Sequence, residues 1–366
     1  MAQKKTSNGA FSAVKQLLAT LFLGANLVTL FLLWICCAST WVDPSMHPRM
    51  SVVGLLFPVF LFLNVAFLLL WLIYKPRMMV VPLVGMALCG NYILDYFPLN
   101  LGGKDKAHDL RIMTWNAGYF NGLPSDSFLL GLDYIMSCRA DIVCLQEAQP
   151  SPYLMRTLEE RVTGEGGYFE REGTRVLISR FPVVDKGTIE AESKSKYGNN
   201  TRYYHLLMDG DTVTLLNAHL ECYNLSADEK DEYGDVLHSR DRDKMKSEVK
   251  YLTGRLAYSS RYRALQVKAI AQFLDNLPKG RRVLLCGDFN DTPISYAYQQ
   301  IDKRLENAYR GGGFGVGLSF REKNFPVRID HIFHSQEWEC VSARIDRSTD
   351  ISDHYPVIAD LKNWQK

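Results

Sequence analysis

The 366-residue chain lacks a strong net charge, a cysteine framework and any internal repeat or low-complexity tract. A formal net charge of +2 gives the whole molecule little attraction to polyanions, which counts against a nucleic-acid binder that relies on a basic face. Of the eight cysteines, five lie in the polar part of the chain. Because five is odd and the spacing is not that of metal ligands, we expect neither a disulfide framework nor a zinc site.

Charge is also absent from two long apolar runs near the N-terminus, Gln16–Ala38 and Val52–Tyr74. Each is long enough to cross a bilayer, since about 20 residues suffice. A cleaved signal peptide would explain the first run, but the second run argues against it. A third and weaker segment, Met78–Phe97, contains proline, glycine and Asp95, and it either spans the membrane or lies at its interface. The sequence therefore predicts an integral membrane protein that contacts the lipid bilayer through N-terminal helices.

Basic residues beside these runs indicate their orientation. Three lysines precede the first run, one arginine lies in the first loop and two basic residues lie in the second: Lys4, Lys5 and Lys15; Arg49; Lys75 and Arg77. This pattern places the N-terminus and the second loop in the cytoplasm. Three spans would then put the polar domain on the outer side, and two would keep it in the cytoplasm. We favour three, although Lys104, Lys106 and Arg111 after the third segment weaken that choice.

A Gly/Lys linker, Leu101–Ala107, divides a transmembrane region (residues 1–100, helices at about 16–38, 52–74 and 78–97) from a polar domain (residues 108–366). In that domain short apolar segments such as Leu110–Trp115 and Ile142–Leu145 predict strands. The apolar spacing of Arg261–Leu277 predicts a helix. Strands that alternate with helices indicate a layered α/β or α+β fold.

Ser226–Ser260 is acid-rich in its first part and basic in its second. The simplest interpretation is a solvated loop followed by a helix. The alternative is a lid, or a face toward anionic lipid or substrate.

The stretch Leu284–Pro293, LLCGDFNDTP, predicts a buried strand that ends in polar residues. Gly287 allows the backbone to turn, and Asp288 and Asn290, two residues apart, point to the same side while Phe289 points into the core. A carboxylate and an amide delivered together suit metal and phosphate chemistry. The same residue types also form ordinary Asx turns, so this stretch alone decides nothing.

Six short motifs place polar residues at or beside predicted strand ends. They are TWNAGYF with Asn116, CLQEAQ with Glu147, LLNAHLE with Asn217 and His219, GDFN with Asp288 and Asn290, RIDHIF with Asp330, and SDHYPV with Asp353 and His354. Each alone has an ordinary explanation as a turn residue, a surface charge or a buried histidine. The six motifs in this order are a more specific signal of function than any one motif alone.

That order and spelling resemble the endonuclease/exonuclease/phosphatase superfamily, which includes DNase-type nucleases, apurinic endonucleases, bacterial sphingomyelinases and inositol polyphosphate 5-phosphatases. The resemblance covers about Leu110 to Leu361. It implies an α+β fold, a four-layered α/β/β/α sandwich of two packed mixed sheets, here preceded by transmembrane helices. It also implies hydrolysis of phosphoester bonds with Mg²⁺, or with Mn²⁺ or Ca²⁺ in its place.

Carried onto this chain, the resemblance implies a metal site and a substrate site. Glu147 would be the main metal carboxylate, with Asn116 beside it and Asp353 as a further ligand. Asn217 would help to position the substrate. Arg263, in RALQ, matches a helix of the family that often bears Arg and Gln near the site. Apart from the resemblance, Arg202 in NNTRYY either reaches phosphate or is a solvated arginine at a strand edge.

The resemblance implies catalytic roles for five further residues. Asp288 would position or deprotonate the attacking water, and Asn290 would bind the phosphate or the nucleophile. His354, oriented by Asp330, would act on the scissile phosphate, and His219 would stabilise its charge or assist the leaving group. Whether Asp288 or His354 is the general base stays open.

Two hypotheses follow. The first is a membrane-tethered, metal-dependent phosphoesterase, acting on diesters or monoesters, whose substrate is a phospholipid head group, a nucleic acid or a small phosphoester. The second is a non-catalytic, membrane-anchored binding module on the same fold. The presence of Glu147, Asp288, Asn290, Asp330 and His354 favours the enzyme, because a degenerate copy would have lost some of them.

Overall fold

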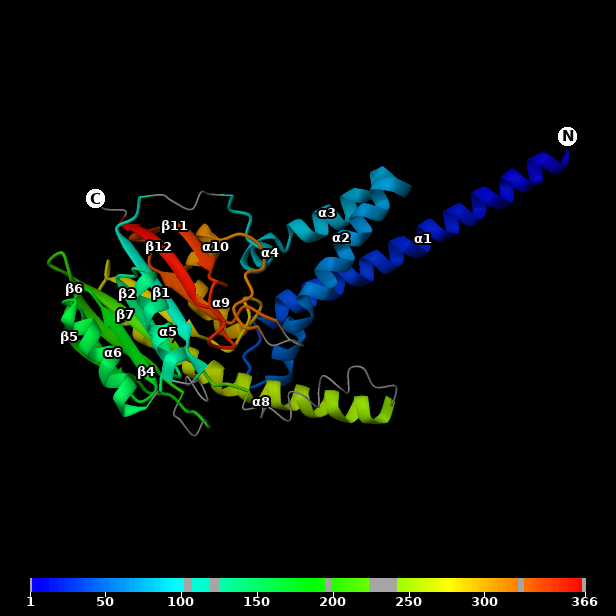
Figure 1. Cartoon of the computed structure of the whole chain (residues 1–366). Coiled ribbons are helices and arrows are strands. Elements are labelled where there is room, and N and C mark those ends of the chain that lie inside the picture. The colour runs from blue at the N-terminus through cyan, green and yellow to red at the C-terminus, as the bar shows by residue number, and fades with distance from the viewer. Residues whose placement is uncertain are drawn as a thin grey trace.

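The computed structural model describes residues 2–101, 107–118, 125–149, 151–194, 199–223, 242–321 and 326–363. A bundle of N-terminal helices projects from a two-sheet domain, and the N-terminus lies at the far end of the bundle (Figure 1). The bundle begins with α1 (Ala2–Ser39). It continues with the 3₁₀ helix η1 (Pro48–Leu56), which runs directly into α2 (Phe57–Tyr74).

Two helical segments, Ala13–Ser39 and Pro48–Tyr74, are long and apolar enough to cross a membrane. The third predicted segment forms η2 (Pro76–Met79), α3 (Val80–Ala87) and α4 (Gly90–Tyr96). It bends by 72° between Ala87 and Gly90, so it is not one straight helix.

A buried polar cluster joins the first two helices of the bundle. The Asn26 amide donates to Asn64 Oδ1 at 3.0 Å, and Trp71 Nε1 donates to Asn26 Oδ1 at 3.1 Å. In an apolar environment such bonds satisfy side chains that would otherwise be costly to bury, so they fix how α1 packs against α2.

The domain consists of two six-stranded sheets. The first has the order β11-β12-β1-β2-β4-β3, and the second has the order β5-β6-β7-β8-β10-β9. Their strands are β1 (Leu110–Asn116), β2 (Ile142–Gln146), β3 (Tyr168–Glu172), β4 (Arg175–Ser179), β11 (Trp338–Ile345) and β12 (Val357–Asn363) in the first sheet. The second contains β5 (Val183–Ile189), β6 (Thr201–Met208), β7 (Asp211–His219), β8 (Arg282–Asp288), β9 (Glu306–Asn307) and β10 (Asp330–His334).

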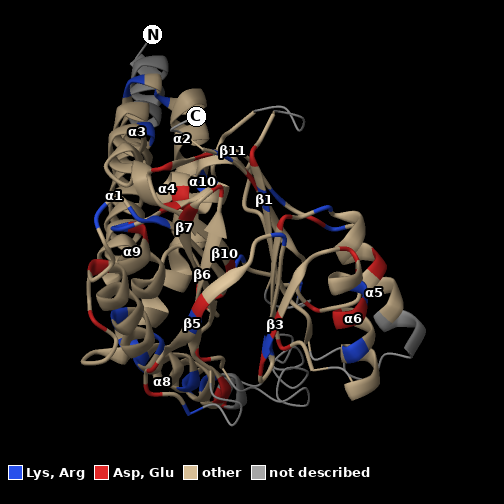
Figure 2. Cartoon of the chain, turned by 90° about the vertical axis from the view of Figure 1, so that its left-hand side faces the viewer, with Lys and Arg blue, Asp and Glu red and all other residues tan. Residues whose placement is uncertain are grey.

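Helices cover the outer face of each sheet. Those outside the first sheet are α5 (Ser125–Ser137) and α6 (Pro152–Gly164). Those outside the second are α8 (Arg242–Asp275) and α9 (Tyr296–Asp302), while α10 (Ala308–Gly312) packs on β11. Figure 2 shows the layers edge-on, with the two sheets face to face between the helices. Three apolar cores separate the layers, so the predicted four-layered α+β sandwich is confirmed.

The elements differ in extent from those predicted. Helix α8 begins at Arg242, nineteen residues before Arg261, so the helix expected in the second part of Ser226–Ser260 is continuous with the predicted helix Arg261–Leu277. The acid-rich part of Ser226–Ser260 falls largely on residues 224–241, and the linker on 102–106, so both lie outside the described residues.

The bundle is fastened to the domain by buried polar contacts. Arg310 donates to Asp95 Oδ1 at 2.7 Å, Gln299 donates to Asp95 Oδ2 at 3.0 Å, and Arg328 donates to the Asp95 carbonyl. Elsewhere Lys268 of α8 pairs with Asp43, in the loop after α1. The domain therefore rests on the α1–η1 loop and on α4.

Candidate active site

Parallel strand pairs bring polar residues to one end of the two sheets. Strand β1 lies parallel to β2, and Asn116 is opposite Gln146, directly before Glu147. In the second sheet β7 lies parallel to β8, with His219 opposite Asp288. Because parallel strands end together, each sheet contributes two of these side chains to the same edge.

Side chains from the two sheets meet across the sandwich. Asn116 Nδ2 donates to Asp288 Oδ2 at 2.9 Å, and both residues are at most 2 % exposed. The second Asp288 oxygen accepts the Asn290 backbone N–H at 2.8 Å. A carboxylate held by an amide from each side has a fixed direction, as a catalytic group requires.

Gly287 makes this approach possible. Its φ is +143°, and a Cβ added there would lie 1.8 Å from the Ala218 carbonyl oxygen on β7. A residue with a side chain would separate the ends of β7 and β8.

The positive-φ non-glycine residues include Glu147 and Asn290, both at +50°. Side-chain-bearing residues rarely adopt this conformation, and those that do cluster at functional sites. Glu147 departs from the direction of β2, and its side chain is 20 % exposed.

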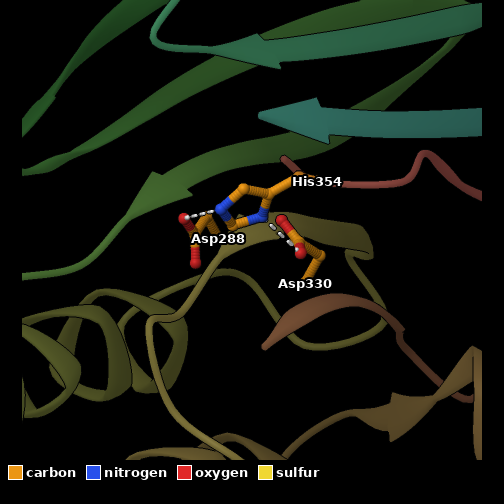
Figure 3. A group of neighbouring side chains, drawn as sticks. All are labelled: Asp288, Asp330 and His354. Carbon is orange, nitrogen blue, oxygen red and sulfur yellow. Dashed lines mark hydrogen bonds and ion pairs between the residues drawn. The ribbon is translucent and has the colours of Figure 1, made fainter. Parts of the chain in front are cut away.

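Asp330, His354 and Asp288 form a hydrogen-bonded and ion-paired row (Figure 3). Asp330, the first residue of β10, is opposite Asp288 in the register, and its Oδ2 lies 2.8 Å from His354 Nδ1. His354 Nε2 lies 3.9 Å from Asp288 Oδ2. Burial lowers the pKa of His354, but the charges of Asp330 and Asp288 outweigh it and raise that pKa to about 10. His354 is therefore an imidazolium at neutral pH.

Asp288 has the opposite balance. Burial raises the pKa of Asp288, and the charge of Asp330 raises it further. The charge of His354 and the hydrogen bond from Asn116 lower it, and the resulting pKa is raised to about 7. A carboxylate with this pKa exchanges a proton near neutral pH.

His219 stays neutral in the same cluster. Its Nε2 lies 3.5 Å from Glu147 Oε1 and 3.8 Å from Asp288 Oδ2. Burial, then the charges of Arg175 and His354, lowers its pKa to about 3. Arg175, a buried cation on β4, is a residue that the sequence analysis missed, because an arginine at a strand start carries no motif.

The oxygen donors at this edge fit a hard cation. Glu147 offers a partly exposed carboxylate, and Asn116 Oδ1 accepts one bond, from Gly118 N at 3.0 Å, which leaves a second lone pair. His219 Nε2, which faces Glu147, is buried without a hydrogen-bond partner. Mg²⁺ keeps several waters, so a few protein oxygens are enough to hold it.

A second set of potential ligands is Asp288, Asp330 and His354, whose ligand atoms all lie within 4.8 Å of one another. His354 Nδ1 is already hydrogen-bonded to Asp330 Oδ2 at 2.8 Å, which turns its other ring nitrogen toward Asp288. We therefore interpret this trio as a proton-transfer row, and Glu147 with Asn116 as the metal seat.

Asp353 and Asn290 lie beside this cluster. Asp353 is exposed, and the Ser352 hydroxyl reaches both the Asn116 carbonyl (2.8 Å) and Asp353 Oδ1 (3.4 Å). The Asn290 amide donates to the Leu220 carbonyl at 3.1 Å, which ties the two loops that follow β7 and β8. Asp353 is thus at the rim next to Asn116.

Three predicted substrate-binding residues have other partners. Asn217 accepts from Gln146 at 2.8 Å and donates to carbonyls of Leu145 and Val176, so it links the two sheets. Arg202 bonds Thr188 and pairs with Glu172. We read these two as structural links, and their role as substrate contacts stays untested.

Arg263 is 1 % exposed and fully engaged behind the site. It bonds Asp291 Oδ2 at 3.1 Å, the Glu221 carbonyl at 2.9 Å and Ser260 Oγ at 2.7 Å. These contacts hold the segments after β7 and β8 in place, so Arg263 supports the loop that carries Asn290 and the segment that follows His219.

The family model for the Endonuclease/Exonuclease/phosphatase family matches residues 113–354, about two thirds of the chain and the whole cluster just described. This chain belongs to the endonuclease/exonuclease/phosphatase family. A second model, a domain of unknown function (DUF8431), matches residues 19–96 of the helical bundle. The resemblance expected from the six motifs is confirmed.

Several solved structures are similar to this chain. The human nocturnin catalytic domain with bound sulfate has a TM-score of 0.50 and 19 % identity, covering 69 % of this chain and 94 % of its own. Sphingomyelinase C from Streptomyces griseocarneus has a TM-score of 0.48 and 17 % identity, covering 69 % of this chain and 98 % of its own. Humanized D. rerio TDP2 has a TM-score of 0.47 and 14 % identity, covering 69 % of this chain and 99 % of its own. None of the curated proteins compared with this chain matches it.

Proposed function

We propose that this family member is a membrane-anchored, divalent-cation-dependent phosphodiesterase. The observation that carries the proposal is the convergence of Asp288, His354 and Asp330 with Asn116 from the opposite sheet. Family membership supports hydrolysis of phosphoester bonds. The diester preference, the metal and the membrane anchor are the parts that we propose.

His354 neutralises the substrate in this scheme. A phosphodiester carries one negative charge, and the protonated His354 ring can donate from Nε2 to a phosphoryl oxygen. Asp330 holds the ring by its Nδ1–H at 2.8 Å and stabilises its charge. Charge that grows on the phosphoryl oxygens in the transition state therefore meets a fixed cation.

Asp288 accepts the proton of the attacking water. Its pKa of about 7 lets a large fraction be ionised at neutral pH while it remains basic enough to take a proton. Asn116 and the Asn290 N–H aim the carboxylate. The neutral His219 ring, 3.8 Å from Asp288, can bind a second phosphoryl oxygen or the leaving group.

Glu147 and Asn116, with Asp353 at the rim, would hold Mg²⁺ or a similar cation. When bound, such a cation withdraws charge from the phosphoryl oxygens. The oxygen-only donor set favours Mg²⁺, Mn²⁺ or Ca²⁺ over softer metals.

We propose that the catalytic domain lies on the outer side, opposite the N-terminus. Tyr74, at the end of α2, donates to the Lys15 carbonyl, so the end of α2 lies beside the N-terminal part of α1. Cys36, Phe57 and Cys89 pack together at the other end, beside the domain. Segment 75–97 thus returns to the domain side, which supports three crossings, and the basic N-terminus indicates the cytoplasm. The boundaries 1–100 and 108–366 stay predictions.

The test uses the full chain purified in detergent. We expect hydrolysis of bis(p-nitrophenyl) phosphate with Mg²⁺, loss of the activity with EDTA, and a fall of roughly 10²–10⁴-fold for Asp288→Asn. His205→Gln, on β6 outside the cluster, is the matched control and retains activity. Hydrolysis of p-nitrophenyl phosphate at a greater rate than the diester would contradict the diester preference.

The same assay separates the enzyme from a non-catalytic binding module. A binding module would show no metal-dependent turnover of either ester, and Asp288→Asn would change nothing. The complete cluster favours the enzyme, because a module has no use for a histidine charged by two buried carboxylates.

A further inference from the structure

Helix α8 is much longer than the sheet that it covers. Its 34 residues extend about 51 Å at 1.5 Å per residue. The second half is buried, with Val267 and Ile270 at most 1 % exposed. In the first half Leu256 is buried, but three large side chains on another face are exposed: Val249, Tyr251 and Tyr258 are 49 %, 46 % and 49 % exposed. Packing against the sheet therefore explains only the second half of the length of α8.

The helix is joined to the segment that connects the two apolar helices. It packs along η1, which runs into α2. Lys268 pairs with Asp43 and also donates to Ser45 Oγ at 3.0 Å, just after α1 ends. Figure 1 shows the first half of α8 extending from the domain on the same side as α1, α2 and α3. A bilayer crossed by α1 and α2 would therefore face this half.

One stripe of the first half combines basic and aromatic side chains. A groove of about 450 Å³ is lined by Ser247, Lys250, Tyr251, Gly254, Arg255 and Tyr258. These positions recur every three or four residues, so they lie on one face of the helix. The Arg255 guanidinium lies over the Tyr251 ring at 5.8 Å.

The charge of this half is positive. Residues 242–258 contain five Lys and Arg against two acids, Asp243 and Glu248. Lysine and arginine stems cover apolar surface while their heads reach phosphate, and tyrosine rings favour the boundary between head groups and acyl chains. Such a surface complements an anionic bilayer.

We propose that the Lys246–Tyr258 face of α8 binds the anionic lipid head groups of the bilayer that α1 and α2 span. This inference rests on the proposed membrane anchor. Farther along the same helix, Arg263 holds Asp291 and the Glu221 carbonyl behind the active site. Head-group binding thus acts on the helix that supports the catalytic loops, and it fixes the orientation of the domain above the membrane.

The experiment compares backbone hydrogen exchange of residues 246–258 in two kinds of nanodisc carrying the full chain. One contains phosphatidylcholine alone, and the other an equal mixture with phosphatidylglycerol. We expect severalfold slower exchange in the anionic discs, and a return toward the phosphatidylcholine rate as NaCl is added, because salt screens the attraction. Equal rates in the two lipids, or slowing that salt does not reverse, would overturn the proposal.

Charge reversal supplies the second measurement. Lys246→Glu/Lys250→Glu should remove the slowing, since each basic residue near an anionic surface contributes about fivefold to binding. The matched control, Lys279→Glu/Lys362→Glu, changes two exposed lysines outside this face and should preserve it. Slowing that survives Lys246→Glu/Lys250→Glu would contradict the assigned face.

These outcomes are separable from failure of the proposed function. A chain that does not incorporate into nanodiscs would refute the membrane anchor, and an inactive chain would refute the phosphodiesterase. Incorporated, active protein with lipid-independent exchange would refute only the head-group surface.

Discussion

Asn116 and Asp288 end strands of different sheets, and the amide of the first donates to the carboxylate of the second at 2.9 Å. This contact closes the sandwich at the edge where the candidate metal seat meets the proton-transfer row. Any relative movement of the sheets would break the contact, so the packing of the sandwich and the geometry of the site depend on each other.

The metal seat and the proton-transfer row should respond differently to mutation. We expect Glu147→Gln to raise the Mg²⁺ concentration for half-maximal activity at least tenfold, because the carboxylate proposed as the main metal ligand is lost. Asp288→Asn should lower kcat and leave that concentration within about twofold of the wild type. Metal titrations of both variants measure this. A similar shift in metal dependence for both variants would place Asp288 among the ligands instead.

Gly287 should tolerate no side chain. In Gly287→Ala the new Cβ meets the Ala218 carbonyl at 1.8 Å, at a φ of +143°. We expect a loss of several kcal/mol of stability, seen as a lower melting temperature of the full chain in detergent. Gly164→Ala is the control, because nothing lies within 4 Å of its added Cβ and it ends helix α6. Equal melting temperatures for the two variants would show that β7 and β8 are not held so closely.

Acid should destabilise the protein through His331. This ring is buried among Phe289, Tyr298 and Phe333, and burial, with the Arg328 charge, lowers its pKa to about 3. The unfolded chain takes up the proton below pH ~6.5, so stability is complete above that pH and falls as the pH drops toward 3.

Between pH 7.5 and pH 5 this loss is about 2 kcal/mol. His331→Gln can still donate to the Asp291 carbonyl that His331 Nε2 contacts at 3.0 Å. It should therefore show a smaller fall in melting temperature over this interval than the wild type. An identical fall in both proteins would mean that other groups, such as His334, dominate the acid response.

The junction between helical bundle and domain depends on Asp95. This buried carboxylate pairs with Arg310 at 2.7 Å, and its removal deprives the half-buried donors of Arg310 and Gln299 of this partner. We expect Asp95→Ala to cost about 3–5 kcal/mol in stability. Arg304→Met breaks an exposed pair with Asp275 and should cost at most about 1 kcal/mol. Thermal unfolding in detergent compares the two, and a milder effect of Asp95→Ala would show that the pair does not hold the bundle.

The strand-end residues were predictable because their signal is local. An apolar segment that ends in Asp, Asn or His marks a strand tip, and the register then brings Asn116, His219 and Asp288 to one edge. The family resemblance supplied what local pattern lacks, namely that tips of different sheets face each other.

The contacts of Asn217, Arg202 and Arg263 show what a local sequence pattern does not reveal. Except for Ser260 beside Arg263, the partners named above come from strands and loops 14 to 72 residues away, and pairing across sheets has no sequence signal. Arg175 was missed for the same reason. The first half of α8 agrees with the helix expected in the second part of Ser226–Ser260, but its continuity with Arg261–Leu277 was not predicted.

The central claim is that Asp330 and His354 act as one unit beside Asp288. The most direct test measures kcat for phosphodiester hydrolysis by Asp330→Asn, His354→Gln and the double variant. A single unit predicts that the double variant is no slower than the slower single variant, since removing either residue already disables the row. Losses that multiply in the double variant would contradict the account, because the two residues would then act independently.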